Sequence, residues 1–192
     1  MTSREKELLH LLHKEVKPAL GCTEPIAVAL ATAKAVELVS ERVSLDRMTS
    51  QMKLHVYVSG NILKNGMGVG IPGTGMIGLR IAAALGAVCG RSEYGLEVLK
   101  DLNDNAIKRA KELVADGNVC IDREGNCHKL YVKCVVEAEG HSAWCVIEDE
   151  HDSTKYIAKQ RDNGEYLLSA RLETDKVNEM FDLGLPESDE YM

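Results

Sequence analysis

The chain has 192 residues, of which 45% are hydrophobic and only 4% aromatic, so a packed interior built from aliphatic side chains is expected. Its 30 acidic and 23 basic residues give a formal charge of −7, which disfavours binding to the phosphate backbone of nucleic acids. No apolar run approaches the ~20 residues that a membrane helix needs, and the charged N-terminus has no signal-peptide pattern. A soluble, cytoplasmic protein with reduced thiols is therefore expected.

Two helices are predicted near the N-terminus. Apolar residues recur at helical spacing over residues 3–16, with Ser3 as the expected N-cap. The second helix is expected over about 24–42, with Thr23 as its N-cap. Small apolar residues surround most of this second helix, which predicts that it is buried.

The middle of the chain changes character twice. Alternation from Met52 predicts a strand, and residues 61–78 then contain six glycines and one proline, too many for a regular element. A buried helix is expected to begin near Met76. One or two more helices are predicted within 94–116, the last of them ended by Gly117.

From Asn118 onward, short alternating runs separated by turn residues predict consecutive strands in an antiparallel meander, followed by a short helix at about 174–182. The predicted fold class is α+β, with N-terminal helices around a glycine-rich loop and an antiparallel sheet after them. The chain is interpreted as a single unit with a helical and glycine-loop lobe at about 1–117 and a strand lobe at about 118–170.

Cys22 is the first candidate for chemistry. It stands directly before the expected start of a helix, where free N–H groups and the helix dipole would lower the pKa of the thiol. A lowered pKa suits a nucleophile, a base or a metal ligand. Glu24 opposes this effect if its carboxylate points the same way. The alternative reading of Cys22 is a small thiol with a packing role.

The glycine-rich stretch is the second candidate. Its glycines leave N–H groups uncovered ahead of a helix, and Lys64 adds a positive charge, so a site for a carboxylate or phosphate is expected over residues 61–75. The spacing of three of these glycines matches GxGxxG, but Pro72 interrupts the turn and argues against a dinucleotide site. The alternative is a long crossover loop with no ligand.

The remaining cysteines give weaker signals. No Cys-x-x-Cys pair exists, so a structural zinc site is poorly supported. Cys134 and Cys145 alternate with apolar residues and are predicted to be core. Cys127, next to His128 near a turn, is a weak metal candidate.

The segment "EVKPALGCTEPIAVALA", together with "VYVSGNILKNGMGVGIPGTGMIG", resembles the L-cysteine desulfidase family, which is related to the alpha chain of iron–sulfur serine dehydratase. Both motifs are long and specific, and they occur in the expected order. Members of that family are much longer, so the resemblance implies that this chain is the N-terminal part of a larger catalytic domain.

The resemblance implies an enzyme that converts L-cysteine to pyruvate, ammonia and sulfide with a four-iron four-sulfur (4Fe-4S) cluster. Cys22 matches the motif cysteine and is implied to be either a cluster ligand or the base, and Lys64 is implied to act with it. The other cluster cysteines of the family lie in the region that is missing here, so this chain alone is expected to be inactive. Roles in substrate binding are implied for Asn61, Lys64, Asn65, Gly73 and Thr74.

Two alternatives stay open. One is a lyase similar to L-serine dehydratase that acts on another β-substituted amino acid. The other is a non-catalytic interaction or regulatory half that lacks the cluster. The expected partners are a small amino-acid substrate and the missing C-terminal region or a partner chain; a homo-oligomer is left open, and neither nucleic acid nor membrane is expected.

Overall fold

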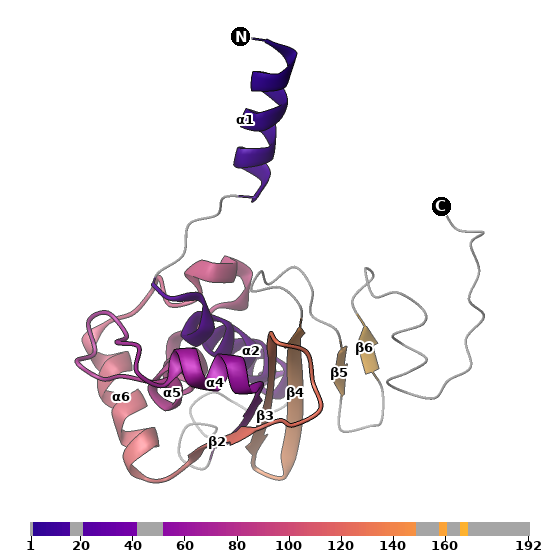
Figure 1. Cartoon of the computed structure of the whole chain (residues 1–192). Coiled ribbons are helices and arrows are strands. Elements are labelled where there is room, and N and C mark those ends of the chain that lie inside the picture. Colours follow the sequence, from indigo (N-terminus) through magenta and orange to yellow (C-terminus); the bar gives the residue numbers. More distant parts are fainter. Residues whose placement is uncertain (1, 16–20, 42–51, 149–157, 161–165, 169–192) are drawn as a thin grey trace, which may run out of the picture.

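A computed structural model of the chain describes residues 2–15, 21–41, 52–148, 158–160 and 166–168 (Figure 1). The helices are α1 (Ser3–Glu15), α2 (Thr23–Ser40), α4 (Gly60–Gly66), α5 (Leu79–Cys89), the 3-10 helix η1 (Ser92–Glu97) and α6 (Asp104–Ala115). The strands are β1 (Lys53–Val58), β2 (Val119–Arg123), β3 (Tyr131–Ala138), β4 (His141–Glu148), β5 (Ala158–Gln160) and β6 (Tyr166–Leu168). The helix predicted at 174–182 lies outside the described residues.

Four strands form one mixed sheet in the order β2-β1-β3-β4, and β5 and β6 form a separate antiparallel pair. The predicted α+β class is confirmed. β3 and β4 are antiparallel as expected, with Val135 opposite Trp144. However, β2 does not join an antiparallel meander, because it pairs in parallel with β1. The chain between β1 and β2 passes through several helices, and a crossover of that length allows the second strand to run in the same direction as the first.

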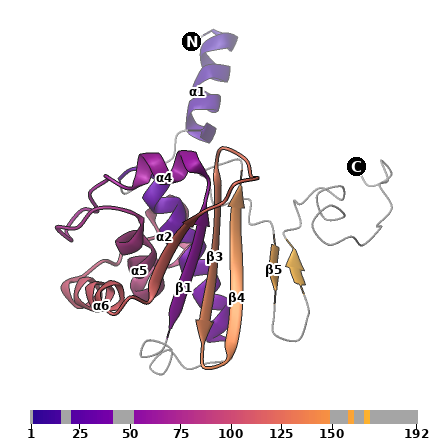
Figure 2. The ribbon, with the colours of Figure 1, turned by 60° about the horizontal axis from the view of Figure 1, so that its bottom comes forward.

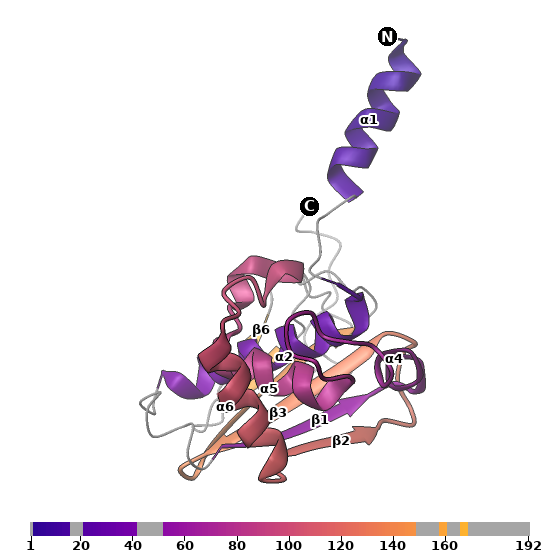
Figure 3. The same cartoon turned by 90° about the vertical axis from the view of Figure 1, so that its left-hand side faces the viewer.

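Helix α2 covers one face of this sheet and forms the centre of the core (Figures 2 and 3). Leu54, Val56 and Val136 lie on the sheet face that α2 and α5 cover, and they are fully buried. Cys134 and Cys145 share this face and are 0% and 1% exposed, so their predicted core position is confirmed. The alternation of apolar residues that predicted the strands thus arises because every second side chain points to the buried face of the sheet.

Close packing between α2 and α5 depends on two glycines. A Cβ atom built on Gly86 of α5 would collide with the backbone carbonyl of Ala29 on α2. At the end of α5, a Cβ on Gly90 would lie 2.8 Å from the Cβ of Ala33. Small residues therefore allow the two buried helices to approach closely as they pack side by side on the sheet, with α2 against β3 and β4 and α5 against β1 and β2.

Both predicted N-caps in the first 42 residues are wrong by one position. At α1, Thr2 rather than Ser3 caps the helix: its Oγ1 accepts from the Glu5 N–H at 3.3 Å, and Glu5 Oε2 accepts from the Thr2 N–H at 2.8 Å. At α2, the N-cap is Cys22, which has extended backbone angles, whereas Thr23 is already helical. Cys22 therefore lies at the helix terminus itself.

The glycine-rich stretch is more regular than predicted, because Gly60–Gly66 forms helix α4. Ser59 starts this helix by accepting a hydrogen bond from the Ile62 N–H, and its hydroxyl also donates to the Lys129 carbonyl at 2.6 Å. Ile62 is 1% exposed, so an anchored apolar side chain and a cap offset the low helix propensity of glycine and asparagine.

The prediction of helices between residues 94 and 116 is confirmed by η1 and α6. Gly117 ends α6 with a positive φ of 76°. Its N–H donates to the Val114 carbonyl, and the Asn118 N–H donates to the Leu113 carbonyl, the hydrogen-bond pattern of a Schellman motif. None of the helices in the described ranges is long and apolar enough to cross a bilayer.

Candidate functional site

The two motifs that suggested a site meet at the N-terminus of α2. The Cys22 thiol donates to Oε2 of Glu24 at 3.0 Å, and Oε1 of the same carboxylate accepts from the side-chain amide of Asn65 on α4 at 3.2 Å. Gly21 lies beside the glycine-rich loop, since a Cβ built on it would be 3.9 Å from the ring of Pro72. Cys22 is exposed to solvent. The fold thus brings a thiol, a carboxylate and an amide together from two distant segments.

The expected lowering of the Cys22 pKa is wrong. The hydrogen bond from the thiol to Glu24 raises the pKa of Cys22, and desolvation and the negative charge of Glu24 act in the same direction. The backbone amides of Thr23 and Glu24 lower the pKa as the helix-terminus argument requires, but their effect is smaller. Glu24 therefore holds Cys22 as a protonated thiol.

The sequence reasoning named Glu24 as a possible influence on the pKa of Cys22 but did not count it among the site residues. A carboxylate two positions after a helix-capping thiol is within reach of it, and this spacing was the available signal. Its link to Asn65 was not predictable, because it depends on the position of α4. Among the residues assigned by resemblance, the structure brings Cys22 and Asn65 into one network through Glu24.

Asn61 and Lys64 also lie on α4, and both are exposed. With Asn65 they are spaced three and four positions apart, so the three side chains share one face of the helix. Lys64 is the basic residue of the last turn. This face presents a cation and two amides beside the Cys22 network.

The loop after α4 is tightly organised and is not a run of free donors. Backbone N–H groups of this loop donate within it: Val69 to Gly66, Ile71 to Met76, Thr74 to Ile71 and Gly78 to Val69. Helix α5 begins at Leu79 rather than near Met76, because Gly78 adopts φ 93° and leaves the helix pattern. The predicted anion site therefore loses these N–H groups as ligands.

Thr74 shapes the loop. It is 3% exposed, its hydroxyl donates to the Ile71 carbonyl at 2.7 Å, and the same oxygen accepts from the Met76 N–H at 3.0 Å. Gly73 is exposed with φ 77° and lies near Leu102, at 3.7 Å from a Cβ built on it. These contacts give Thr74 a role in the turn, while Gly73 stays on the loop surface.

All six cysteines lie within the described residues and are thiols. Burial raises the pKa of Cys134 to about 12, and burial with the nearby charge of Asp101 raises the pKa of Cys89 to about 11. Cys127, the weak metal candidate, contacts the Glu124 carbonyl at 3.6 Å. No group of three or more Cys, His, Asp and Glu side chains in the described part of the chain could hold a metal ion.

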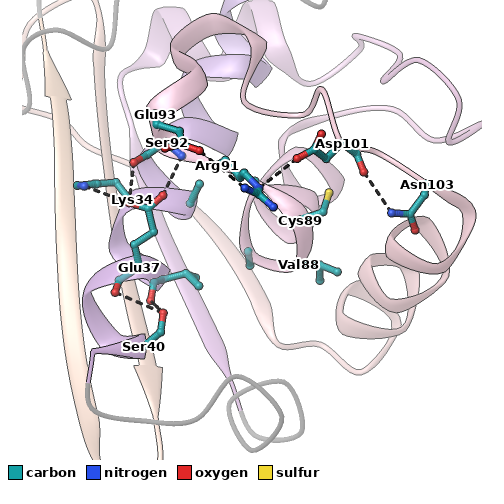
Figure 4. A pocket seen from close by; sticks show the side chains of 14 residues that line it. Lys34, Glu37, Ser40, Val88, Cys89, Arg91, Ser92, Glu93, Asp101 and Asn103 are labelled. Atoms are coloured by element: carbon teal, nitrogen blue, oxygen red, sulfur yellow. Dashed lines mark hydrogen bonds and ion pairs between the residues drawn. The ribbon is translucent and has the colours of Figure 1, made fainter.

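A separate groove of about 800 Å³ lies between the C-terminal half of α2, the end of α5 and η1 (Figure 4). Lys34 on its wall follows Cys22 by twelve positions, or roughly 18 Å along the helix. None of the residues assigned by resemblance lines the groove, whose labelled lining residues are Lys34, Glu37, Ser40, Val88, Cys89, Arg91, Ser92, Glu93, Asp101 and Asn103.

The polar groups of this groove bind one another. Glu37 accepts from the Ser92 N–H at 2.8 Å, from the Ser92 hydroxyl at 2.6 Å and from Lys34 at 3.0 Å. Arg91 pairs with Asp101 at 3.1 Å. The contacts of Glu37 fix η1 against α2, and the Arg91–Asp101 pair joins the two ends of the segment that contains η1. The polar groups of the groove therefore have a structural role.

The described chain is thus an α+β protein with a thiol–carboxylate–amide network at the start of its central helix. It is similar to proteins named "UPF0597 protein" from several bacteria. The protein of Parabacteroides distasonis is 48% identical over 165 residues, that of Bacteroides fragilis 48% over 158 residues, and that of Shewanella pealeana 46% over 171 residues. These matches cover 86%, 82% and 89% of this chain, respectively.

The same matches include only 36%, 35% and 38% of the relatives' own lengths, so the chain corresponds to little more than a third of each relative. The names of these relatives state no activity. No protein-family profile matches the chain. No solved structure matches it either.

Proposed function

We propose that this chain is the part of an L-cysteine desulfidase that carries the Cys22 site, and that the complete enzyme converts L-cysteine to pyruvate, ammonia and sulfide. One observation supports this proposal above the others. The GCTEP motif and the glycine-rich motif are distant in sequence, and they meet through the hydrogen bond between Glu24 and Asn65. Two motifs that act together in one reaction need such a meeting point.

The proposed reaction is an elimination. A base removes the proton from Cα, the Cα–H electron pair forms the Cα=Cβ bond, and the Cβ–S bond breaks with release of sulfide. The aminoacrylate then tautomerises to an imine, which water hydrolyses to pyruvate and ammonia. The proton transfer from Cα needs a side chain of the protein, and so does charge stabilisation at the carboxylate of the substrate.

Within this scheme Cys22 and Glu24 form one proton-transfer unit. The thiol donates to Glu24 in the resting protein, so a substrate that displaces this hydrogen bond finds a carboxylate ready to accept a proton. Lys64 supplies the positive charge for the substrate carboxylate, with Asn61 and Asn65 on the same face of α4, and Gly73 stays a substrate-binding candidate from the loop. The same geometry also fits Cys22 as a thiolate ligand, with Glu24 receiving its proton.

The 4Fe-4S cluster that the resemblance implies needs several thiolates that converge. The described residues do not fit a complete cluster, because Cys134 and Cys145 are in the core and no three ligating side chains converge elsewhere in the described ranges. The proposal therefore assigns Cys22 alone as a ligand from this chain. The remaining ligands belong to the missing C-terminal region or a partner chain, and the proposed location of the enzyme is the cytoplasm.

The test is activity of the chain with and without the region that it lacks. The chain is produced anaerobically, alone and joined to the part of the Parabacteroides distasonis relative that it does not cover, and supplied with iron and sulfide. Pyruvate and released sulfide are measured with L-cysteine and with L-serine. We expect turnover of cysteine only in the joined protein, and loss of at least 100-fold in kcat for Cys22→Ser, consistent with the size of acid–base effects.

Cys120→Ser is the matched control, because Cys120 is also exposed but lies on β2. It should retain full activity. Turnover of serine in preference to cysteine would replace the proposal with the serine dehydratase alternative. A folded joined protein that turns over neither amino acid would favour the non-catalytic alternative.

A further inference from the structure

Helix α1 carries an apolar face that the described residues do not cover. Its four leucines, here called the leucine face, are between 41% and 53% exposed and lie on one side of the helix at spacings of one, three and four positions: Leu8, Leu9, Leu11 and Leu12. No other described segment lies along this helix in Figures 1 and 3. A helix with such a face normally packs it against another element.

The helix also needs a partner for its own stability. Helices shorter than about 12–15 residues are marginal in water, and α1 has 13. The capping box formed by Thr2 and Glu5 favours its first turn, but most helical stability in proteins comes from packing of the apolar face. The partner of the leucine face is therefore part of what makes α1 a helix.

A second copy of this chain is a poor candidate. Four half-exposed leucines offer on the order of a few hundred Å² per copy, whereas stable interfaces bury about 800 Å² per partner. A segment of the same polypeptide has no such requirement, because its association loses little translational and rotational freedom.

A membrane surface is also a poor candidate. Among the described side chains of α1, Arg4 and Lys6 balance Glu5 and Glu7, and the whole chain carries −7. Helices that bind at membrane surfaces are typically rich in Lys and Arg on the polar face, which attracts anionic lipids. Nothing in the charge of α1 provides that attraction.

The lengths of the relatives point to a different partner. This chain corresponds to 35–38% of the length of each of the three relatives named above, so each contains a larger region that this chain does not cover. We propose that the leucine face of α1 docks onto that uncovered region, as an intramolecular helix contact in the longer protein. This proposal does not depend on the desulfidase activity.

Hydrogen exchange of the α1 amides tests the proposal. It is measured by mass spectrometry for the 192-residue chain alone at several concentrations and for the protein joined to the uncovered region of the Parabacteroides distasonis relative. Co-expression of the two parts as separate chains serves where the joined protein does not fold. We expect fast exchange at every concentration in the chain alone, and at least tenfold slower exchange when the uncovered region is present.

The key variant is Leu8→Ala with Leu12→Ala. Alanine has the higher helix propensity, so lost protection would reflect the lost apolar contact and not a weaker helix. This double variant should return exchange in the joined protein to the rate of the chain alone. The control is Lys6→Ala with Glu7→Ala on exposed polar positions, which should keep the protection.

Three results would overturn the proposal. The first is α1 exchange that slows with concentration in the chain alone, which would identify a second copy as the partner. The second is co-sedimentation of the chain with vesicles of phosphatidylethanolamine and phosphatidylglycerol that depends on the leucines. The third is protection that is absent, or insensitive to the leucine variant, when the uncovered region is present and folded.

Discussion

The side-chain amide of Asn65 donates to the carboxylate of Glu24 across 3.2 Å, although the two residues are 41 positions apart. The other oxygen of this carboxylate accepts from the Cys22 thiol. Glu24 therefore links the start of the central helix to α4 and also determines the protonation of the thiol. Its two roles are separable by substitution.

Replacing Glu24 with Gln should make Cys22 more reactive. The hydrogen bond to the carboxylate is the largest cause of the raised pKa of Cys22, so its removal lowers the pKa and increases the thiolate fraction at neutral pH. Alkylation of Cys22 at pH 7, followed by site-resolved mass spectrometry, should therefore be faster than in the wild type, because the thiolate is the form that reacts.

Cys127 in the same sample is the internal control, because its pKa is raised mainly by burial, with smaller contributions from Glu124 and Glu148. Its alkylation rate should not change. Equal or slower alkylation of Cys22 in the Glu24→Gln protein would show that the helix terminus, and not Glu24, controls this thiol.

The elements with regular apolar spacing were predictable from sequence, and the contacts between them were not. The core positions of Cys134 and Cys145 follow from alternation alone. Helix α4 was missed because glycine and asparagine have low helix propensity, and the cap by Ser59 and the burial of Ile62 decide the outcome. The parallel pairing of β2 depends on where the crossover helices pack, which the sequence of β2 does not contain.

In the candidate site, too, local features were predictable from sequence and the contacts between side chains were not. The sequence placed Cys22 at a helix terminus and gave the correct direction for the effect of the backbone amides on its pKa. It did not give the orientation of Glu24, whose carboxylate reverses the result. The prediction of free N–H groups in the glycine-rich loop was wrong for Ile71 and Thr74, because both groups donate to backbone carbonyls of the same loop.

Gly86→Ala should destabilise the protein by about 1–3 kcal/mol, the range for an overpacked core. The new Cβ would meet the Ala29 carbonyl, so α5 must move away from α2. Gly68→Ala is the matched control, since a Cβ there meets nothing within 4 Å and its φ is not positive. Urea unfolding should show a lower midpoint only for Gly86→Ala, and equal midpoints would contradict the close approach of the two helices.

Stability should fall in acid partly through Glu37. Burial of this carboxyl opposes its ionisation, but hydrogen bonds from Ser92 and Lys34 outweigh it, so its pKa is below the ordinary 4.5. A depressed pKa stabilises the folded state above the unfolded pKa, and the contribution disappears as the pH falls through the folded value. Glu37→Gln should therefore lower the free energy of unfolding at pH 6, with a difference that narrows as the pH falls well below 4.5.

Urea unfolding at a series of pH values from 6 to about 3 provides this measurement, in the range where carboxylates titrate. Glu112→Gln, at an exposed position on α6, is the control and should follow the wild-type pH profile. A difference between Glu37→Gln and wild type that stays constant over the whole range would mean that Glu37 contributes through packing rather than through its charge.

Lys64 and Thr74, which share a predicted role in substrate binding, should separate into two kinds of residue. Lys64 is exposed, so Lys64→Met should leave the unfolding midpoint unchanged, and in the joined protein it should raise the KM for L-cysteine about tenfold, as expected for one lost charge-assisted hydrogen bond. Thr74→Val removes the hydroxyl that binds the Ile71 carbonyl and the Met76 N–H, which should cost about 1–3 kcal/mol of stability. Thr74→Ser keeps that hydroxyl and should retain most of the stability. An unchanged KM for Lys64→Met, measured with kcat in the same assay, would remove Lys64 from the substrate site and leave the exposed face of α4 without a cation for the carboxylate.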